Sequence, residues 1–85
     1  MTLRPGCAPS RVLAWLCEQA EPRVRVECVR ALGLPPSCNA FFRLVEAGYV
    51  EVTPHPRVTN IANLSVHAYW PKDAGRAVVA AMRAA

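Results

Sequence analysis

The sequence is poor in acidic residues, in lysine and in long apolar runs. Six of its 85 residues are Asp or Glu and ten are Lys or Arg, nine of them Arg, so the formal net charge is +4. No run approaches the roughly 20 apolar residues of a membrane span, and the N-terminus lacks the basic segment and apolar run of a signal peptide. We therefore predict a cytoplasmic protein with no membrane partner, whose arginines favour an acidic partner.

Motifs that catalysis or metal binding would need are also missing. There is no Gly-rich phosphate loop and no nucleophile elbow, and the six acidic residues form no obvious pair. The two histidines are isolated from each other, and the four cysteines lie ten or eleven residues apart, without the C-x-x-C pair of a typical zinc site. We predict that the protein is not an enzyme and has no cofactor and no metal.

The spacing of the cysteines in a cytosolic chain favours a structural role for them. Cys7, Cys17, Cys28 and Cys38 are interpreted as small buried hydrophobic residues. Redox sensing by Cys17 or another thiol stays open as an alternative.

The chain does contain enough apolar residues for one compact domain. Hydrophobic residues make up 53% of it and charged residues 19%, a balance typical of a packed core. A domain of this length buries only about 60 to 65% of its unfolded surface, so additional stabilisation by dimerisation is expected. Residues 1–9, with Pro5, Gly6 and Pro9, are predicted to form a flexible arm, and residues 10–85 the domain.

Helical periodicity dominates the first half of the domain. Ser10 is the predicted N-cap of a first helix that Pro22 ends. Its expected apolar face is Val12, Leu13, Leu16, Cys17 and Ala20. A short β-prone run at 23–26 leads into a second helix at 27–32, which Gly33 ends. A third helix is predicted from Pro36 to Gly48. Its expected apolar face is Cys38, Phe41, Phe42, Leu44 and Val45, and its expected outward face is Asn39, Ala40, Arg43 and Ala47.

The second half begins with a two-residue alternation. It predicts strands at 49–53 and 61–70, joined by a loop that contains His55. Pro71 should end the second strand and Asp73 should cap a last helix. The expected apolar face of that helix is Ala74, Ala77, Val78, Ala81, Met82 and Ala85, with Arg76 and Arg83 opposite.

Two stretches of this α+β pattern resemble the winged helix-turn-helix transcription regulators of bacteria, of the MarR-like and ArsR-like kind. Residues 24–50 are similar to their second helix, third helix and first wing strand, with Ala31-Leu32-Gly33-Leu34 at the turn and Leu44-Val45-Glu46-Ala47-Gly48-Tyr49-Val50 at the exit. Residues 69–77, Tyr69-Trp70-Pro71-Lys72-Asp73-Ala74-Gly75-Arg76-Ala77, look like the second wing strand entering the next helix. The resemblance implies a three-helix core, a β-hairpin wing and a C-terminal helix.

The same resemblance implies a DNA-binding regulator, such as a repressor, with the third helix in the major groove. There Asn39 would pair with adenine and Arg43 with guanine, while the wing reaches the minor groove or flanking phosphates. The predicted DNA contacts come from the start of the second helix, the third helix and the wing: Arg23, Arg25, Ser37, Asn39, Ala40, Arg43, Arg57, Thr59 and Asn60.

Two predictions concern partners. The first and last helices carry more apolar surface than a small core needs, so Trp15, Val79 and Met82 are expected at a homodimer interface. The alternative to DNA binding is a winged-helix protein-interaction module, such as a phage or mobile-element accessory factor. It is motivated by the low net charge and by the single basic residue, Arg43, of the third helix.

Overall fold

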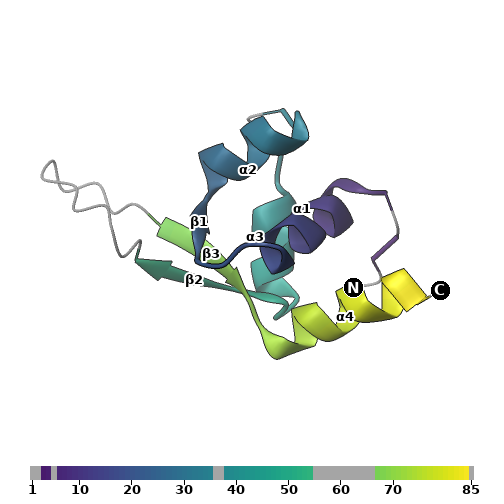
Figure 1. Cartoon of the computed structure of the whole chain (residues 1–85). Helices are drawn as coiled ribbons and strands as arrows, with labels where there is room; N and C mark the ends of the chain where they lie inside the picture. Colours follow the sequence, from purple (N-terminus) through teal and green to yellow (C-terminus); the bar gives the residue numbers. More distant parts are fainter. Residues whose placement is uncertain (1–2, 5, 36–37, 55–66, 85) are drawn as a thin grey trace, which may run out of the picture.

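The computed structural model describes residues 3–4, 6–35, 38–54 and 67–84 and has a small α+β architecture (Figure 1). Its elements are α1 (Ala8–Cys17), β1 (Arg23–Val24), α2 (Arg25–Leu32), α3 (Ala40–Glu46), β2 (Val50–Pro54), β3 (His67–Pro71) and α4 (Asp73–Ala84). The predicted order of helices and strands is confirmed. None of the helices in the described ranges combines the length and apolarity that crossing a bilayer requires.

The three strands form one antiparallel sheet in the order β1-β3-β2. Val52 of β2 and Arg23 of β1 both lie opposite Tyr69 of β3. The Lys72 N–H donates to the Tyr49 carbonyl oxygen at 2.9 Å and closes the base of the β2–β3 hairpin. In Figure 1 this hairpin extends away from the helices. Pro71 is the last residue of β3, as predicted, and positions 61–66 of the predicted strand lie outside the described residues.

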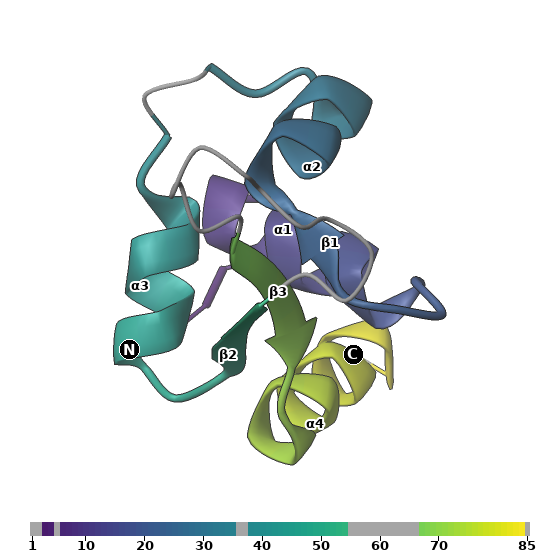
Figure 2. The same cartoon turned by 90° about the vertical axis from the view of Figure 1, so that its left-hand side faces the viewer.

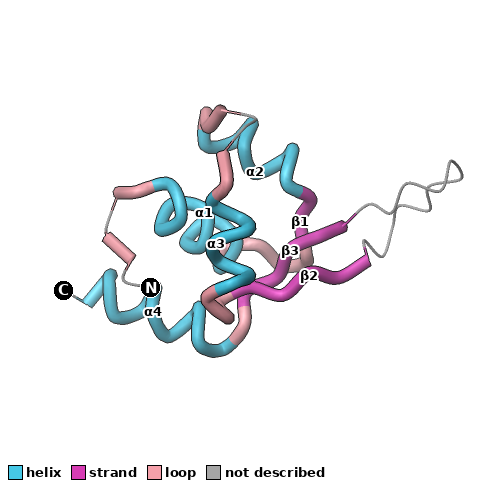
Figure 3. Tube along the Cα trace, turned by 180° about the vertical axis from the view of Figure 1, so that it is seen from behind, coloured by secondary structure: helices cyan, strands magenta, loops and turns pink. Residues whose placement is uncertain are grey.

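α1 is the centre of the hydrophobic core. Val12, Leu13 and Leu16 of the predicted apolar face are entirely buried. Cys17 is only half-buried, and Ala20 is exposed beyond the end of the helix, so the prediction is wrong for these two. The helix contacts α2, α3, α4 and β3. α2 lies at one end of the molecule and α4 at the other, with α1 and α3 between them (Figures 2 and 3).

The predicted start of α1 is wrong by three residues. The helix begins at Ala8, with Cys7 as N-cap and Pro9 in the first turn, where the missing N–H costs no helical hydrogen bond. Ser10 therefore lies inside the helix, and its hydroxyl donates to the Arg4 carbonyl oxygen at 2.5 Å. The chain before α1 is thus held to its first turn.

The start and the end of α2 lie close to the predicted positions. α2 begins at Arg25, two residues earlier than expected, and β1 is correspondingly short. Gly33 ends the helix with φ 66°, the left-handed conformation that the sequence predicts. The Arg11 guanidinium donates to the Leu32 carbonyl oxygen at 2.8 Å and joins α1 to this helix end.

The apolar face expected for α3 is wrong at two positions. Ala40 is entirely buried instead of outward, and Phe42 is 68% exposed instead of in the core. Phe41 and Leu44 are buried as predicted. The described helix begins at Ala40, and positions 36 and 37 lie outside the described residues. α3 thus packs through a small residue and leaves a large one on the surface.

α4 shows the same kind of rotation. Gly75 and Val79 are its buried residues, whereas Ala74, Ala77 and Ala81 of the predicted apolar face are exposed. The cause is close packing, because a Cβ atom at Gly75 would overlap the carbonyl oxygen of Tyr49. Arg76, expected to point into solvent, stacks over the Trp70 ring at 5.0 Å from its centroid. Asp73 is the first helical residue, and Lys72 accepts the first helical hydrogen bond from Arg76.

Candidate functional site

The outward face of α3 presents a compact set of polar and aromatic side chains. Asn39, Phe42, Arg43 and Glu46 are all exposed. At roughly 100° per residue these four positions fall within about 100° of the helix circumference. Asn39 occupies the N-cap position, yet its side chain makes no capping hydrogen bond. Its amide is therefore not engaged in holding the helix end.

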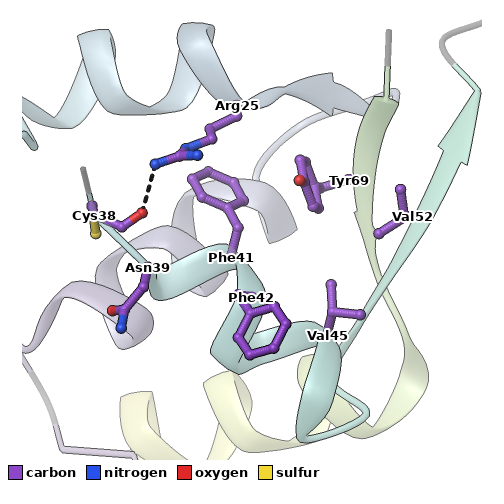
Figure 4. Close-up of a pocket in the computed structure, with 8 residues that line it drawn as sticks. All are labelled: Arg25, Cys38, Asn39, Phe41, Phe42, Val45, Val52 and Tyr69. Carbon is purple, nitrogen blue, oxygen red and sulfur yellow. Dashed lines mark hydrogen bonds between the residues drawn. The ribbon is translucent and has the colours of Figure 1, made fainter. Parts of the chain in front are cut away.

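A groove of about 340 Å³ lies between α3, the start of α2 and the hairpin, and mostly apolar atoms line it. Its lining residues are Arg25, Cys38, Asn39, Phe41, Phe42, Val45, Val52 and Tyr69. Phe41 and Tyr69 pack ring against ring inside it, with centroids 4.7 Å apart and planes tilted by 49°. Figure 4 shows Phe41 and Phe42 projecting from α3 in different directions, Phe41 towards Arg25 and Tyr69.

Arg25 fixes the polar end of this groove. It lies in the first turn of α2, and its guanidinium donates to the Cys38 carbonyl oxygen at 2.7 Å (Figure 4). A charge-assisted hydrogen bond of this kind holds the segment before α3 against α2. The positive charge of Arg25 therefore stands beside the N-terminal end of α3, close to Asn39.

Only part of the predicted DNA-binding set is brought together. Arg25 and Asn39 line one groove, and Arg43 is exposed on the adjoining face of α3. Ala40 is buried and cannot touch a partner, so its predicted base contact is wrong. Ser37, Arg57, Thr59 and Asn60 lie outside the described residues.

Arg23 is held by side chains of its own neighbourhood, including two carboxylates. Its Nη1 atom lies 3.1 Å from Glu27 Oε2 and 3.9 Å from Glu21 Oε1. Its Nε atom donates to the Gln19 side chain at 3.2 Å. Two carboxylates thus offset the positive charge that was expected to meet a phosphate.

The predicted dimer residues do not form one surface patch. Val79 is only 3% exposed and belongs to the core of the chain, so it offers little surface to a partner. Trp15 and Met82 are half-buried against that core. Met82 and Val79 both line a shallow apolar depression of about 200 Å³, together with Ala14 and Arg83. The rotation of α4 described above accounts for this difference.

The thiols differ in their surroundings. All four cysteines are free, and only Cys28 is fully buried. Burial raises the pKa of Cys28 to about 12, and the neighbouring Cys38 thiol adds to the rise. Burial also raises the pKa of Cys17, whereas at Cys7 hydrogen bonds with Ser10 outweigh burial and lower the pKa. Within the described ranges no group of three His, Cys, Asp or Glu side chains could hold a metal ion.

Sequence reasoning missed Phe42 and Val52 as surface residues of the site. Phe42 is predicted to face the core but is 68% exposed, and Val52 is predicted only to lie in a strand and is 43% exposed. This segment contains more apolar residues than so short a helix can bury, because Ala40, Phe41 and Leu44 already form its buried face.

Comparison of the chain with protein-family models, curated protein sequences and solved structures finds no match. The functional argument therefore rests on the residues of this chain.

Proposed function

We propose that the chain is a winged-helix domain that binds duplex DNA as a transcription regulator. In this proposal α3 enters the major groove, and the β2–β3 hairpin lies on flanking backbone or in the minor groove. The observation that carries it is the exposure of Asn39 and Arg43 on the outward arc of a helix that packs against the hairpin strand β2. An amide and a guanidinium are the side chains that pair with adenine and guanine edges.

The charge of this face predicts modest, salt-dependent affinity. Arg25 and Arg43 flank the exposed face of α3, and Glu46 lies on the same arc. Each phosphate contact lowers affinity about 3.5-fold when salt rises from about 50 to 200 mM, given a slope near −0.9 per contact. Two or three contacts therefore predict a loss of about 10- to 40-fold over that range.

Fluorescence anisotropy of a labelled random-sequence duplex tests the proposal. We expect micromolar, salt-sensitive binding that Arg43→Ala weakens. Arg83→Ala is the matched control, because it removes the same charge from the far end of α4, where Arg83 pairs with Glu18 at 3.3 Å. Absence of binding at micromolar protein, or equal effects of the two variants, would contradict the proposal.

The second candidate is a protein-interaction module on the same scaffold. It is favoured by the mostly apolar groove and by the exposure of Phe42 and Val52 at its edge. A chain that binds no duplex at low salt, but retains a protein partner that Phe42→Asp releases, would support this candidate.

We include a homodimer in the first proposal. Two copies of α3 that reach half-sites roughly 34 Å apart would bind a repeated sequence more tightly than one copy. Trp15 and Met82 keep part of their surface for such contact, whereas Val79 does not. Light scattering would then give twice the 9.3 kDa chain mass, and a monomer at every concentration used for DNA binding would argue against it.

A further inference from the structure

Phe42 is the most exposed of the large apolar side chains in the described part of the protein, at 68%. It lies on the outward arc of α3, one position before Arg43 and one turn after Asn39. Removing a Phe side chain from water is favourable, and the folded chain gains little of that stabilisation because the ring stays exposed. A partner that covers this ring recovers it.

The neighbours of Phe42 restrict the chemistry of that partner. Arg25 lines the same groove as Phe42, and Arg43 is the next residue of α3 and is exposed, so the surroundings of the ring carry positive charge that complements a polyanion. In the major groove of DNA, the C5-methyl group of thymine is the apolar feature of the base edges, and Phe contacts it. The donors and acceptors of adenine and guanine match Asn and Arg.

The spacing along α3 fits neighbouring base pairs. Asn39 and Phe42 are three residues apart, a rise of about 4.5 Å along the helix axis. Successive base pairs are about 3.4 Å apart. An adenine bound by Asn39 and a thymine beneath Phe42 can therefore lie in adjacent or next-adjacent pairs, with Arg43 towards a guanine beside them.

We propose that Phe42 is a specificity-determining residue that reads thymine through its C5-methyl group. This inference rests on the DNA-binding function proposed above and names the feature of the duplex that α3 distinguishes.

Replacing thymine by deoxyuridine tests the inference, because it removes the methyl group and leaves the base-pairing edge unchanged. Duplexes are first selected from a random library with the full chain, and the preferred duplex is then made with thymine and with deoxyuridine. We expect the wild-type chain to bind the deoxyuridine duplex about fourfold more weakly for each methyl contacted. Phe42→Ala should bind both duplexes equally.

Two further variants separate the possible outcomes. Val26→Ala removes an exposed apolar residue of α2, away from the arc of α3, and should keep the preference for thymine. Equal wild-type affinity for both duplexes, with binding still weakened by Arg43→Ala, would overturn the role of Phe42 and leave the DNA function intact. Failure of every duplex to bind would overturn both proposals.

Discussion

α1 and α3 are both rich in apolar residues, but they lie in different surroundings. α1 is covered by α2, α3, α4 and β3, and Val12, Leu13 and Leu16 of its predicted apolar face are buried. α3 is covered on one side only, packs through Ala40 and leaves Phe42 on the surface. The enclosed helix leaves no large apolar side chain fully exposed, with Trp15 half-buried, whereas the peripheral helix leaves Phe42 exposed to a partner.

The largest expected loss of stability comes from truncating a buried side chain of α1. Leu13→Ala should lower the free energy of unfolding by about 3 kcal/mol, because it leaves a cavity in the middle of the core. For a chain of this size that corresponds to a fall of about 12 to 24 °C in melting temperature. Calorimetry or urea titration measures it, and a loss below about 1 kcal/mol would mean that α1 is not the centre of the core.

Gly75→Ala tests whether close packing, and not helix propensity, decides how α4 is rotated. Alanine is favoured over glycine by about 1 kcal/mol inside a helix, yet the new Cβ would overlap the Tyr49 carbonyl oxygen and crowd Leu13 Cδ1 at 3.1 Å. We expect a net loss of about 2 kcal/mol.

Ala77→Gly in the same helix is the control for this substitution. Ala77 is exposed, so only the propensity cost of about 1 kcal/mol should be seen. A gain in stability for Gly75→Ala would contradict the packing of α4 against Tyr49.

Alkaline pH should weaken the α2 side of the core through Cys28. Its pKa is raised from about 9 to about 12, so the fold favours the neutral thiol. That contribution is fully present below about pH 9 and is lost as pH rises towards 12. Urea unfolding at pH 8 and pH 10 should therefore show wild type losing about 1 kcal/mol more stability than Cys28→Ala. Parallel losses in the two chains would mean that Cys28 ionises normally.

The sequence predicts the order of the elements because turn residues and periodicity are local signals. Gly33 takes the left-handed conformation and Pro71 ends its strand, as each residue's backbone chemistry requires. The rotation of α3 and α4 about their axes depends on non-local contacts. The overlap that only a glycine avoids at position 75 involves Tyr49, and no periodicity within α4 contains that information.

The sequence predicts the exposed polar residues of the candidate site, but it does not predict that Phe42 is exposed. Asn39 and Arg43 are exposed as predicted, because burying a polar side chain without a partner is costly. Phe42 was assigned to the core because hydrophobicity alone does not separate a core residue from a contact residue. Arg23 was expected to be available, but its carboxylate partners lie four residues on and two residues back, a pattern that the sequence permits without requiring.

The smallest expected effect on stability tests the difference between α1 and α3 most directly. Phe42→Ala removes more atoms than Leu13→Ala, but the ring is already 68% exposed and alanine is the better helix former. We expect a change within about 0.5 kcal/mol in the free energy of unfolding. A urea titration at low protein concentration measures it. A loss above about 2 kcal/mol would mean that the ring is covered in solution, by a second copy or by the chain itself. An unchanged stability would leave Phe42 available to a partner, so that any defect of this variant in DNA binding arises at the contact itself.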